Sequence, residues 1–360
     1  MKRDYVIVGS GLTGAVIARR LADAGKDIII VERRSRLGGN VADAMHPSGV
    51  NVHIYGPHLF RTESEEIWQF VNRFAKFHTY RHQVKISIDG NLENWPIANS
   101  YIRLVCGENW RPDLRKIEPR NFEEAALNLM PRVIYEIFVK EYTEKQWGVP
   151  AITLLAKLCK RFDVRNNDNP YLTPDALHQG VPTKGYSHLM NRILRGIPVV
   201  LNCDYLKNRH EFGHHKRLIF SGPIDEYFGY ELGKLAYRGQ RRKTNHIVDV
   251  NWRLPCGVVN TPRNKNHIRK IEWKHFMRPD YANQIRGTVL TWEMPYSPEN
   301  PDDYEYPFPD ENNQTLYERY RELADVETGL MICGRLGEYR YYDMDHAIAR
   351  AMELADEILR

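Results

Sequence analysis

Residues 5–14 of this 360-residue chain read Tyr-Val-Ile-Val-Gly-Ser-Gly-Leu-Thr-Gly, an apolar run that stops abruptly in a glycine-rich loop. The run has no polar alternation, so it predicts a buried parallel strand. A helical pattern of small and apolar residues follows over 15–22, and Gly25 closes it. Residues 28–31, Ile-Ile-Ile-Val, predict a second strand that ends in Glu32. This order predicts the first βαβ unit of a doubly wound α/β fold.

The glycine loop has the G-x-G-x-x-G spacing of a dinucleotide-binding turn. Gly9 suits the tight turn, Gly11 lets the backbone approach a pyrophosphate, and Gly14 lets the helix pack closely on the strand. Leu12 and Thr13 stand in the same turn, where free N–H groups and the positive helix end favour phosphates. The loop therefore predicts a dinucleotide held at the start of the helix.

The segment after the second strand distinguishes two cofactors. Glu32 is placed to accept hydrogen bonds from both hydroxyls of a ribose. The stretch from Arg33 to Asn40 contains the pair Gly38 and Gly39, which resembles the E-x(5)-G-G extension of the glutathione-reductase-type FAD family. This resemblance implies that the pair passes close to the phosphates of FAD, an extension that NAD enzymes generally lack. A plain glycine loop after a strand is the alternative interpretation.

Composition excludes several classes of protein. The 51 Lys and Arg against 46 Asp and Glu give a mild net charge of +5, without the clustered basic face that nucleic-acid binding needs. The five cysteines stand far apart, which argues against a zinc site and a disulfide scaffold and fits a reducing compartment. His53 and His58 have no third ligand at a metal-site spacing, so no metal is expected. No stretch approaches a membrane span, so we expect a soluble, cytoplasmic protein without membrane insertion.

Helical and strand patterns alternate along the rest of the chain. We expect a helix over 63–77, a hairpin over 84–92 around an Asp-Gly turn, mostly helical structure over 122–160, and a last helix over 345–359. Further strands are expected at 217–220, 271–276, 288–292 and 330–333.

These patterns predict an α/β fold with three parts. An FAD-binding Rossmann-like domain is interrupted by an inserted helical domain and by an antiparallel-sheet substrate domain. The predicted ranges are 1–80, 181–240 and 325–360 for the first domain, 100–170 for the second, and 81–99 with 241–324 for the third.

Several long strings resemble one family, the bacterial UDP-galactopyranose mutases, over essentially the whole chain. They are Tyr55-Gly-Pro-His-Leu-Phe60, Glu141-Tyr-Thr-Glu-Lys-Gln-Trp-Gly148, Ser221-Gly-Pro-Ile-Asp225, Lys274-His-Phe276 and Gly334-Arg-Leu-Gly-Glu-Tyr-Arg-Tyr-Tyr-Asp-Met344. The resemblance implies an isomerase of nucleotide sugars used in cell-surface polysaccharide synthesis.

The implied reaction converts a UDP-linked hexopyranose to the furanose with no net oxidation. Reduced FAD would attack the anomeric carbon through N5, expel UDP and form a covalent flavin–sugar adduct. Ring opening, reclosure through O4 and return of UDP would complete the cycle. An external flavin reductant is implied, since no second G-x-G-x-x-G is present for NADPH. A homodimer is also expected.

The resemblance also assigns roles to individual residues. The implied catalytic residues, which include two arginines that clamp the diphosphate, are His58, Arg161, Arg269, Tyr306 and Tyr341. The implied substrate-binding residues are Arg61, Asn94, Tyr142, Trp147, Tyr171 and Asp343. Residues assigned to FAD, with those of the glycine loops, are Gly9, Gly11, Leu12, Thr13, Gly14, Glu32, Arg33, Gly38, Gly39, Asn40, His58, Arg335, Asp343 and Met344. By position alone, Tyr142 and Trp147 read as ordinary core aromatics.

One residue departs from the family pattern. Where the family string continues with a second histidine, this chain has Arg61, a feature that resembles relatives accepting altered sugars such as N-acetylgalactosamine. The substrate is therefore open between UDP-galactose, UDP-N-acetylgalactosamine and a related deoxysugar nucleotide. Arg61 could instead point to solvent or pair with Glu63 or Glu65.

Two alternative functions remain, and the first of them is found in proteins that share the pattern of the first forty residues. A conventional FAD oxidoreductase of the amine-oxidase type would consume an electron acceptor stoichiometrically. A flavin-fold binding protein without cofactor, like the GDP-dissociation inhibitors, would have no use for an intact phosphate loop with Glu32 and the Gly38–Gly39 pair.

Overall fold

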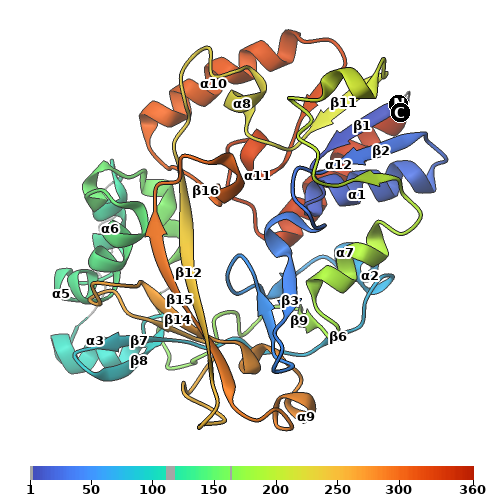
Figure 1. The fold of residues 1–360 in the computed structure, drawn as a ribbon. Helices are drawn as coiled ribbons and strands as arrows, with labels where there is room; N and C mark the ends of the chain where they lie inside the picture. The colour runs from blue at the N-terminus through green and yellow to red at the C-terminus, as the bar shows by residue number, and fades with distance from the viewer. Residues whose placement is uncertain (1–2, 111–117, 163) are drawn as a thin grey trace.

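The structure is a computed structural model that describes residues 3–110, 118–162 and 164–360, so the remaining parts of the predicted domain ranges lie outside it. Figure 1 shows a lobe around β1, β2 and β11, a helical lobe around α3, α5 and α6, and a sheet between them that contains β12 and β15.

The first lobe is built on a five-stranded parallel sheet. Its strands, in spatial order, are β10 (Val199–Val200), β2 (Ile28–Val31), β1 (Tyr5–Val8), β11 (Arg217–Phe220) and β17 (Leu330–Ile332). Alternate residues of the same strand serve opposite faces, since Ile7 packs in one hydrophobic core and Val6 in another. Both faces are therefore buried, as the unbroken apolar runs predicted.

Helices cover each face of this sheet. One face carries α1 (Leu12–Asp23), α2 (Glu65–Asn72), α7 (Tyr186–Ile193) and α12 (Met344–Leu359). The other face carries α8 (Ile224–Tyr227) and α10 (Glu311–Val326). The predicted α/β fold with a Rossmann-like unit is confirmed.

The sheet between the two lobes has seven strands. Its order is β16 (Tyr306–Pro307), β12 (Tyr237–Ile247), β15 (Thr288–Tyr296), β14 (Arg269–Glu272), β13 (Val258–Asn260), β7 (Val84–Ile88) and β8 (Asn91–Trp95). Neighbouring strands are antiparallel except β7 and β13, which pair in parallel, so the expectation of an antiparallel sheet holds for most of it. The paired residues 84–88 and 258–260 come from distant parts of the chain. No local turn signal in the sequence could therefore reveal that β7 and β13 pair.

The helical lobe packs on one end of this sheet. It consists of α3 (Asn99–Cys106), α4 (Phe122–Leu127), α5 (Arg132–Ile134), the π-helical η2 (Tyr135–Lys140), α6 (Glu141–Trp147), η3 (Ala151–Thr153) and η4 (Ala156–Arg161). Ile86 and Ile88 of β7 share its hydrophobic core with Phe138. The helical pattern of 122–160 therefore forms several short helices rather than one.

Smaller elements connect the lobes. They include β3 (Asp43–Met45), β4 (Asn51–His53), β5 (Phe60–Thr62), β6 (Phe77–His78), β9 (His178–Pro182), α9 (Pro279–Ala282), α11 (Gly334–Gly337) and the 3₁₀ turns η1 (Gly39–Val41), η5 (Arg209–Phe212), η6 (Trp273–Phe276) and η7 (Pro301–Asp303). The strand expected over 271–276 thus ends at Glu272, where η6 begins. No described helix is long and apolar enough to cross a membrane.

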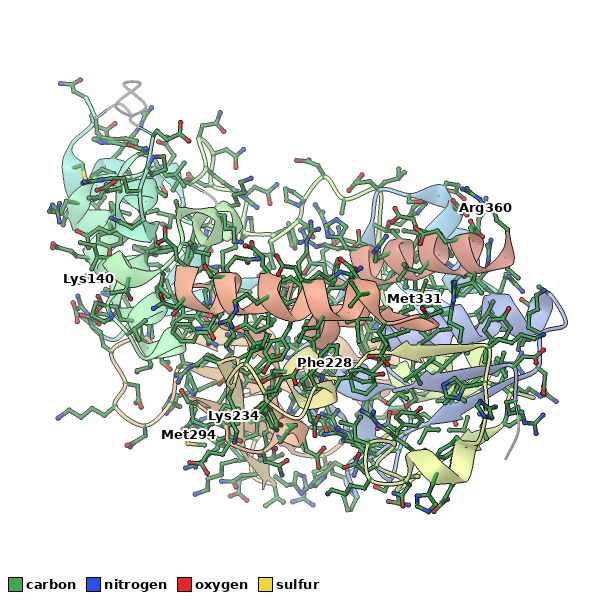
Figure 2. The ribbon with its side chains drawn as sticks, turned by 90° about the horizontal axis from the view of Figure 1, so that it is seen from above. Lys140, Phe228, Lys234, Met294, Met331 and Arg360 are labelled. Atoms are coloured by element: carbon green, nitrogen blue, oxygen red, sulfur yellow. The ribbon has the colours of Figure 1, made fainter. Side chains whose placement is uncertain are left out.

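Two element positions differ from the predicted ranges. β12 begins at Tyr237, so the second sheet takes up the last residues of the range 181–240. Helix α10, predicted with the substrate sheet, instead packs Tyr320 and Ala324 against the parallel sheet. Figure 2 shows α10 lying across the molecule toward Met331, and the separate helix α12 ending next to Arg360.

Candidate active site

The first glycine loop lies where the predicted cofactor phosphates would sit. Gly9 has a φ of +99°, and a Cβ there would come within 2.2 Å of Ser221 Oγ. A Cβ on Gly14 would come within 2.1 Å of the Gly9 carbonyl oxygen, because α1 starts directly against β1. Side chains at either position would therefore close the turn at the start of α1.

The second glycine pair packs directly on the first loop. The Gly38 N–H donates to the Ser10 carbonyl over 3.1 Å. Gly39 has a φ of +52°, and a Cβ there would come within 2.9 Å of Gly11 Cα. The two loops thus form one bare backbone surface at the N-terminus of α1, which fits a pyrophosphate.

Glu32 is almost fully buried at the end of β2, with 5% of the residue exposed. One carboxylate oxygen accepts from Ser10 N and Oγ at 2.8 and 2.6 Å, and the other accepts from Arg34 N at 2.9 Å. These bonds fix the carboxylate at the edge of the cavity. Since each oxygen can accept more than one hydrogen bond, Glu32 can also receive ribose hydroxyls.

One cavity unites the residues assigned to FAD. It is lined by every one of them except Asp343: Gly9, Gly11, Leu12, Thr13, Gly14, Glu32, Arg33, Gly38, Gly39, Asn40, His58, Arg335 and Met344. The Arg33 guanidinium also pairs with Glu226 at 2.7 Å and Asp302 at 3.6 Å, so it is already neutralised by protein. The cavity continues along Cys203–Leu206 and Ser221–Pro223, which sequence reasoning did not assign.

His58 forms part of this cavity wall. The backbone N–H of His58 donates to His53 Nδ1 over 3.0 Å, and its backbone carbonyl accepts from the Tyr186 hydroxyl. Its own Nδ1 is buried without a hydrogen-bond partner among the described residues. Burial, with His53 and Arg335 nearby, lowers the pKa of His58 to about 3. A neutral imidazole with an unused polar atom fits a site that is completed by a bound group.

A row of alternating charges crosses the second sheet beside His58. Arg269 on β14 stands opposite Glu293 on β15, which stands opposite Arg242 on β12. Arg269 Nε lies 3.2 Å from Glu293, and its Nη2 donates to the Tyr142 hydroxyl over 2.6 Å. Burial opposes the charge of Arg269, but Tyr142 and Glu293 outweigh it and raise its pKa. Arg269 is therefore a fixed, partly buried cation.

Aromatic side chains and two further arginines gather next to this row. The rings of Tyr306 and Tyr341 stack 6.2 Å apart, and the Arg335 guanidinium lies 4.8 Å from the Tyr341 ring centre. Although 58% of Tyr341 is exposed, partial desolvation and Asp343 raise its pKa, while the nearby Arg335 and Arg161 oppose that rise. The structure thus brings Arg161 from the helical lobe close to Tyr341, with its side chain exposed.

Three assigned substrate residues have their polar atoms or rings occupied by protein. Trp147 is 5% exposed and packs edge-on against Phe308 with ring centres 5.8 Å apart. The Asn94 side-chain oxygen accepts from Lys85 over 2.6 Å. The Tyr171 ring carries the Arg81 guanidinium 4.0 Å from its centre.

Arg61 pairs with neither Glu63 nor Glu65. Its Nη2 donates to Asp343 Oδ2 over 2.9 Å, with both side chains partly exposed. The pair lines a second, polar cavity formed with residues 164–167, 172–176, Asp345 and His346. Asp343 therefore lies in this second cavity rather than in the one assigned to FAD.

Comparison with known proteins identifies the family of this chain. A model of the UDP-galactopyranose mutase family matches residues 137–341, and a NAD(P)-binding Rossmann-like domain model matches residues 7–74. A probable UDP-galactopyranose mutase of Klebsiella pneumoniae is 34% identical over 99% of this chain and 95% of its own length. The chain belongs to the UDP-galactopyranose mutase family.

Other members and structures agree with this assignment. A dTDP-fucopyranose mutase of Escherichia coli is 31% identical over 97% of both chains. A crystal structure of reduced UDP-galactopyranose mutase superimposes with a TM-score of 0.79 and 17% identity, covering 99% of this chain and 95% of that one, which shows a shared fold. Membership in the UDP-galactopyranose mutase family confirms the predicted isomerase class and the cofactor FAD. It does not favour a conventional oxidoreductase.

Sequence reasoning missed three members of the charge row and its surroundings: Arg242, Glu293 and Glu305. Glu293 and Glu305 are 2% and 5% exposed as side chains, although Asp and Glu are rarely buried unless paired. Their partners come from other strands, so no spacing in the sequence marks them. Among the described residues, no group of three His, Cys, Asp or Glu side chains is placed to hold a metal ion.

Proposed function

We propose that this chain interconverts the pyranose and furanose forms of a UDP-linked hexose, with UDP-galactose and UDP-N-acetylgalactosamine as the candidate substrates. The observation that carries the proposal is the position of Arg269. It is a partly buried, permanently charged guanidinium, held between Tyr142 and Glu293, in a region that also contains Tyr306, Tyr341 and the FAD cavity.

We assign diphosphate binding to Arg269 and Arg161. A guanidinium offers several donors in a fixed plane, which suits phosphate oxygens better than an ammonium does. Arg269 is immobilised by the sheet, whereas Arg161 is exposed at the end of η4, with its guanidinium 5.6 Å from the Phe162 ring centre. The hydroxyls of Tyr142, Tyr306 and Tyr341 would add neutral donors around the same oxygens.

FAD would be held by the two glycine loops, Glu32 and the loop that carries His58. When bound in its reduced form, FAD supplies a nitrogen nucleophile for the anomeric carbon, so the isomerisation needs no net oxidation. The neutral His58 would face the reactive edge of the flavin, and Arg335 is fixed by the carbonyls of Glu305 and Tyr342. These side chains would orient the sugar and keep water from it.

We assign weaker roles to the other substrate residues. Asn94 and Tyr171 would contact the substrate only after releasing Lys85 and Arg81, respectively. Trp147 would support the cleft through Phe308 rather than touch the sugar, because its ring is buried. Asp343 would act from the second cavity, through its pair with Arg61.

A deoxysugar nucleotide linked to dTDP is the second candidate substrate. It is favoured by the Escherichia coli relative, a dTDP-fucopyranose mutase that covers nearly the whole chain. Anaerobic incubation of the dithionite-reduced enzyme with a panel of UDP- and dTDP-sugars, followed by product separation, distinguishes the candidates. Furanose from UDP-galactose supports the proposal, and furanose from dTDP-fucose alone replaces it with the second candidate.

We further propose an external flavin reductant, a homodimer and a cytoplasmic location. The reductant is supported by the single dinucleotide loop of the sequence. Sedimentation of the FAD-loaded protein tests the dimer, and a monomer at micromolar concentration would contradict it.

A further inference from the structure

Arg242 lies at the centre of the charge row, and each of its three side-chain nitrogens donates to protein. Its Nε donates to Glu293 over 2.8 Å, and Nη1 and Nη2 donate to the two carboxylate oxygens of Glu305 over 2.7 and 2.8 Å. The Arg242 side chain is 13% exposed. Such a two-pronged contact fixes the plane of both groups.

The charges of the row and of Glu305, which pairs with Arg242, balance only when Arg242 is counted. Arg242 and Arg269 carry two positive charges, and Glu293 and Glu305 carry two negative charges, all in poorly solvated positions. Without Arg242, Glu293 would keep only Arg269 as a counter-charge, and the buried Glu305 would lose the arginine that pairs with it. The potential at Arg269 would then become negative, which disfavours an anionic ligand.

Arg242 also connects the elements that carry the assigned site residues. Through Glu293 it reaches Arg269, and through Glu305 it holds the residue before Tyr306. The Glu305 carbonyl in turn accepts from Arg335 over 3.2 Å.

The row also touches the loop that carries His58. A Cβ on Gly56 would come within 2.8 Å of Glu293 Oε1 and 3.3 Å of Arg242 Nη2. The row therefore lies directly beneath the backbone of the turn that precedes His58.

We propose that Arg242 is the positioning residue of the diphosphate site: it neutralises Glu293 and Glu305, so that the charge of Arg269 remains available to the ligand. This inference rests on the proposed function, because it takes Arg269 as the diphosphate contact. Arg242 itself makes no contact with the substrate.

Loss of Arg242 should make ligand binding depend on pH. Burial already raises the pKa of Glu305 although Arg242 opposes that rise, so removing Arg242 raises it further. Protonation at lower pH would then relieve the excess negative charge. The charged and titratable groups of the row and of its surroundings are Arg242, Arg269, Glu293, Glu305, Tyr55, Tyr142, Tyr306, His58 and Arg335.

The test measures the affinity of the oxidised, FAD-loaded enzyme for UDP-galactose at pH 8 and pH 6. The charge of this diphosphate diester does not change between those values, and the oxidised enzyme is not expected to turn it over. The variants are Arg242→Gln, Arg242→Lys and the double variant Arg242→Gln/Glu305→Gln. Arg241→Gln is the matched control, since Arg241 is the adjacent, exposed residue of β12 and lies over Tyr296.

Arg242→Gln should weaken binding at least about tenfold at pH 8, since it leaves a buried charge unpaired, and should regain part of that loss at pH 6. The double variant removes one carboxylate with the guanidinium, so its affinity at pH 8 should return most of the way to wild type. Arg242→Lys keeps the charge, so its affinity should not depend on pH. Wild type and Arg241→Gln should bind equally at both pH values.

Flavin absorbance and the melting temperature report whether each variant is folded. If Arg242→Gln loses FAD, the lysine and double variants carry the test. Unchanged affinity in Arg242→Gln, or a double variant as weak as the single one, would overturn the inference. The inference would also be overturned if the affinity of Arg242→Lys depended on pH as strongly as that of Arg242→Gln. Failure of wild type and Arg241→Gln alike to bind would instead contradict the proposed function, and the inference with it.

Discussion

Arg61 Nη2 lies 2.9 Å from Asp343 Oδ2, which joins β5 to the residue that precedes α12 across 282 positions of sequence. Asp343 lies two residues after Tyr341, so the pair ties the segment of the stacked tyrosine to the strand that follows His58. An arginine at this position therefore has a structural partner as well as a proposed role in substrate choice.

If Arg61 also selects the sugar, Arg61→His should lose UDP-N-acetylgalactosamine turnover selectively and keep UDP-galactose turnover. Its remaining guanidinium donors could reach an acetamido carbonyl, which galactose lacks. Asp343→Asn is the control, because it weakens the pair and keeps the arginine. The cost in unfolding free energy should stay at about 0.2–1 kcal/mol for Arg61→His, since both side chains are about one-third or more exposed. Equal loss of both sugars would show that Arg61 is not the selector.

Gly39→Ala should abolish FAD retention. Its φ of +52° is unfavourable for alanine, and the new Cβ would stand 2.9 Å from Gly11 Cα, so the two loops must separate. Gly25→Ala is the matched control, because Gly25 has a φ of +72° and a methyl group there would meet nothing within 4 Å. Gly25→Ala should cost about 1 kcal/mol of stability and keep FAD. The flavin-to-protein absorbance ratio after gel filtration measures both, and an FAD-loaded Gly39→Ala would contradict the assigned phosphate site.

The cofactor cradle was predictable because its parts are local. β1, the loop with Gly9, Gly11 and Gly14, α1, and β2 with Glu32 follow one another within 28 residues, and each step obeys a short-range rule. The packing of Gly39 on Gly11 was not predicted, but it agrees with the expectation that the Gly38–Gly39 pair lies close to the cofactor phosphates. Local backbone requirements leave a direct trace in sequence.

The charge row left no such trace. Arg242, Glu293 and Arg269 meet only because β12, β15 and β14 pair in one register, and a shift of one residue would turn each side chain to the other face. Arg61 and Asp343 likewise meet through the tertiary fold. Sequence spacing does not encode these registers, so the positions of buried counter-ions had to come from the structure.

Arg161→Ala and Arg269→Ala should both slow turnover, by roughly 30- to 1,000-fold, since each removes one contact to the diphosphate charge. Their effects on stability should differ. Arg161 is exposed, so its loss should leave the melting temperature unchanged. Arg269→Ala leaves Tyr142 and one side of Glu293 unpaired and should lower it. Steady-state kinetics and thermal melts of the FAD-loaded variants test this, and loss of FAD from Arg161→Ala would mean that Arg161 is structural.

Acid should destabilise the folded enzyme well before its carboxylates are protonated. His53 and His82 are 1% and 6% exposed, and burial lowers the pKa of each to about 3. The unfolded chain binds protons there below about pH 6.5, whereas the folded chain does not until about pH 3. Stability should therefore fall as the pH drops below about 6.5, by up to about 1.4 kcal/mol per pH unit for each histidine.

Thermal unfolding at pH 7 and pH 5 measures this loss. His82→Phe should lose less on acidification than wild type, while His214→Gln, at an exposed position, should behave as wild type does. An equal loss in His82→Phe and wild type would show that His82 is not kept neutral by burial.

Reduced FAD is proposed to serve isomerisation without net redox. The most direct measurement compares UDP-galactose turnover by the dithionite-reduced enzyme and by the fully oxidised, reductant-free enzyme under strict anaerobiosis, with products and consumed reductant both quantified. We expect many turnovers per reduced flavin, no reductant consumed per furanose formed, and no turnover by the oxidised enzyme. Equal activity of the oxidised enzyme, or one reductant equivalent consumed per product, would contradict it.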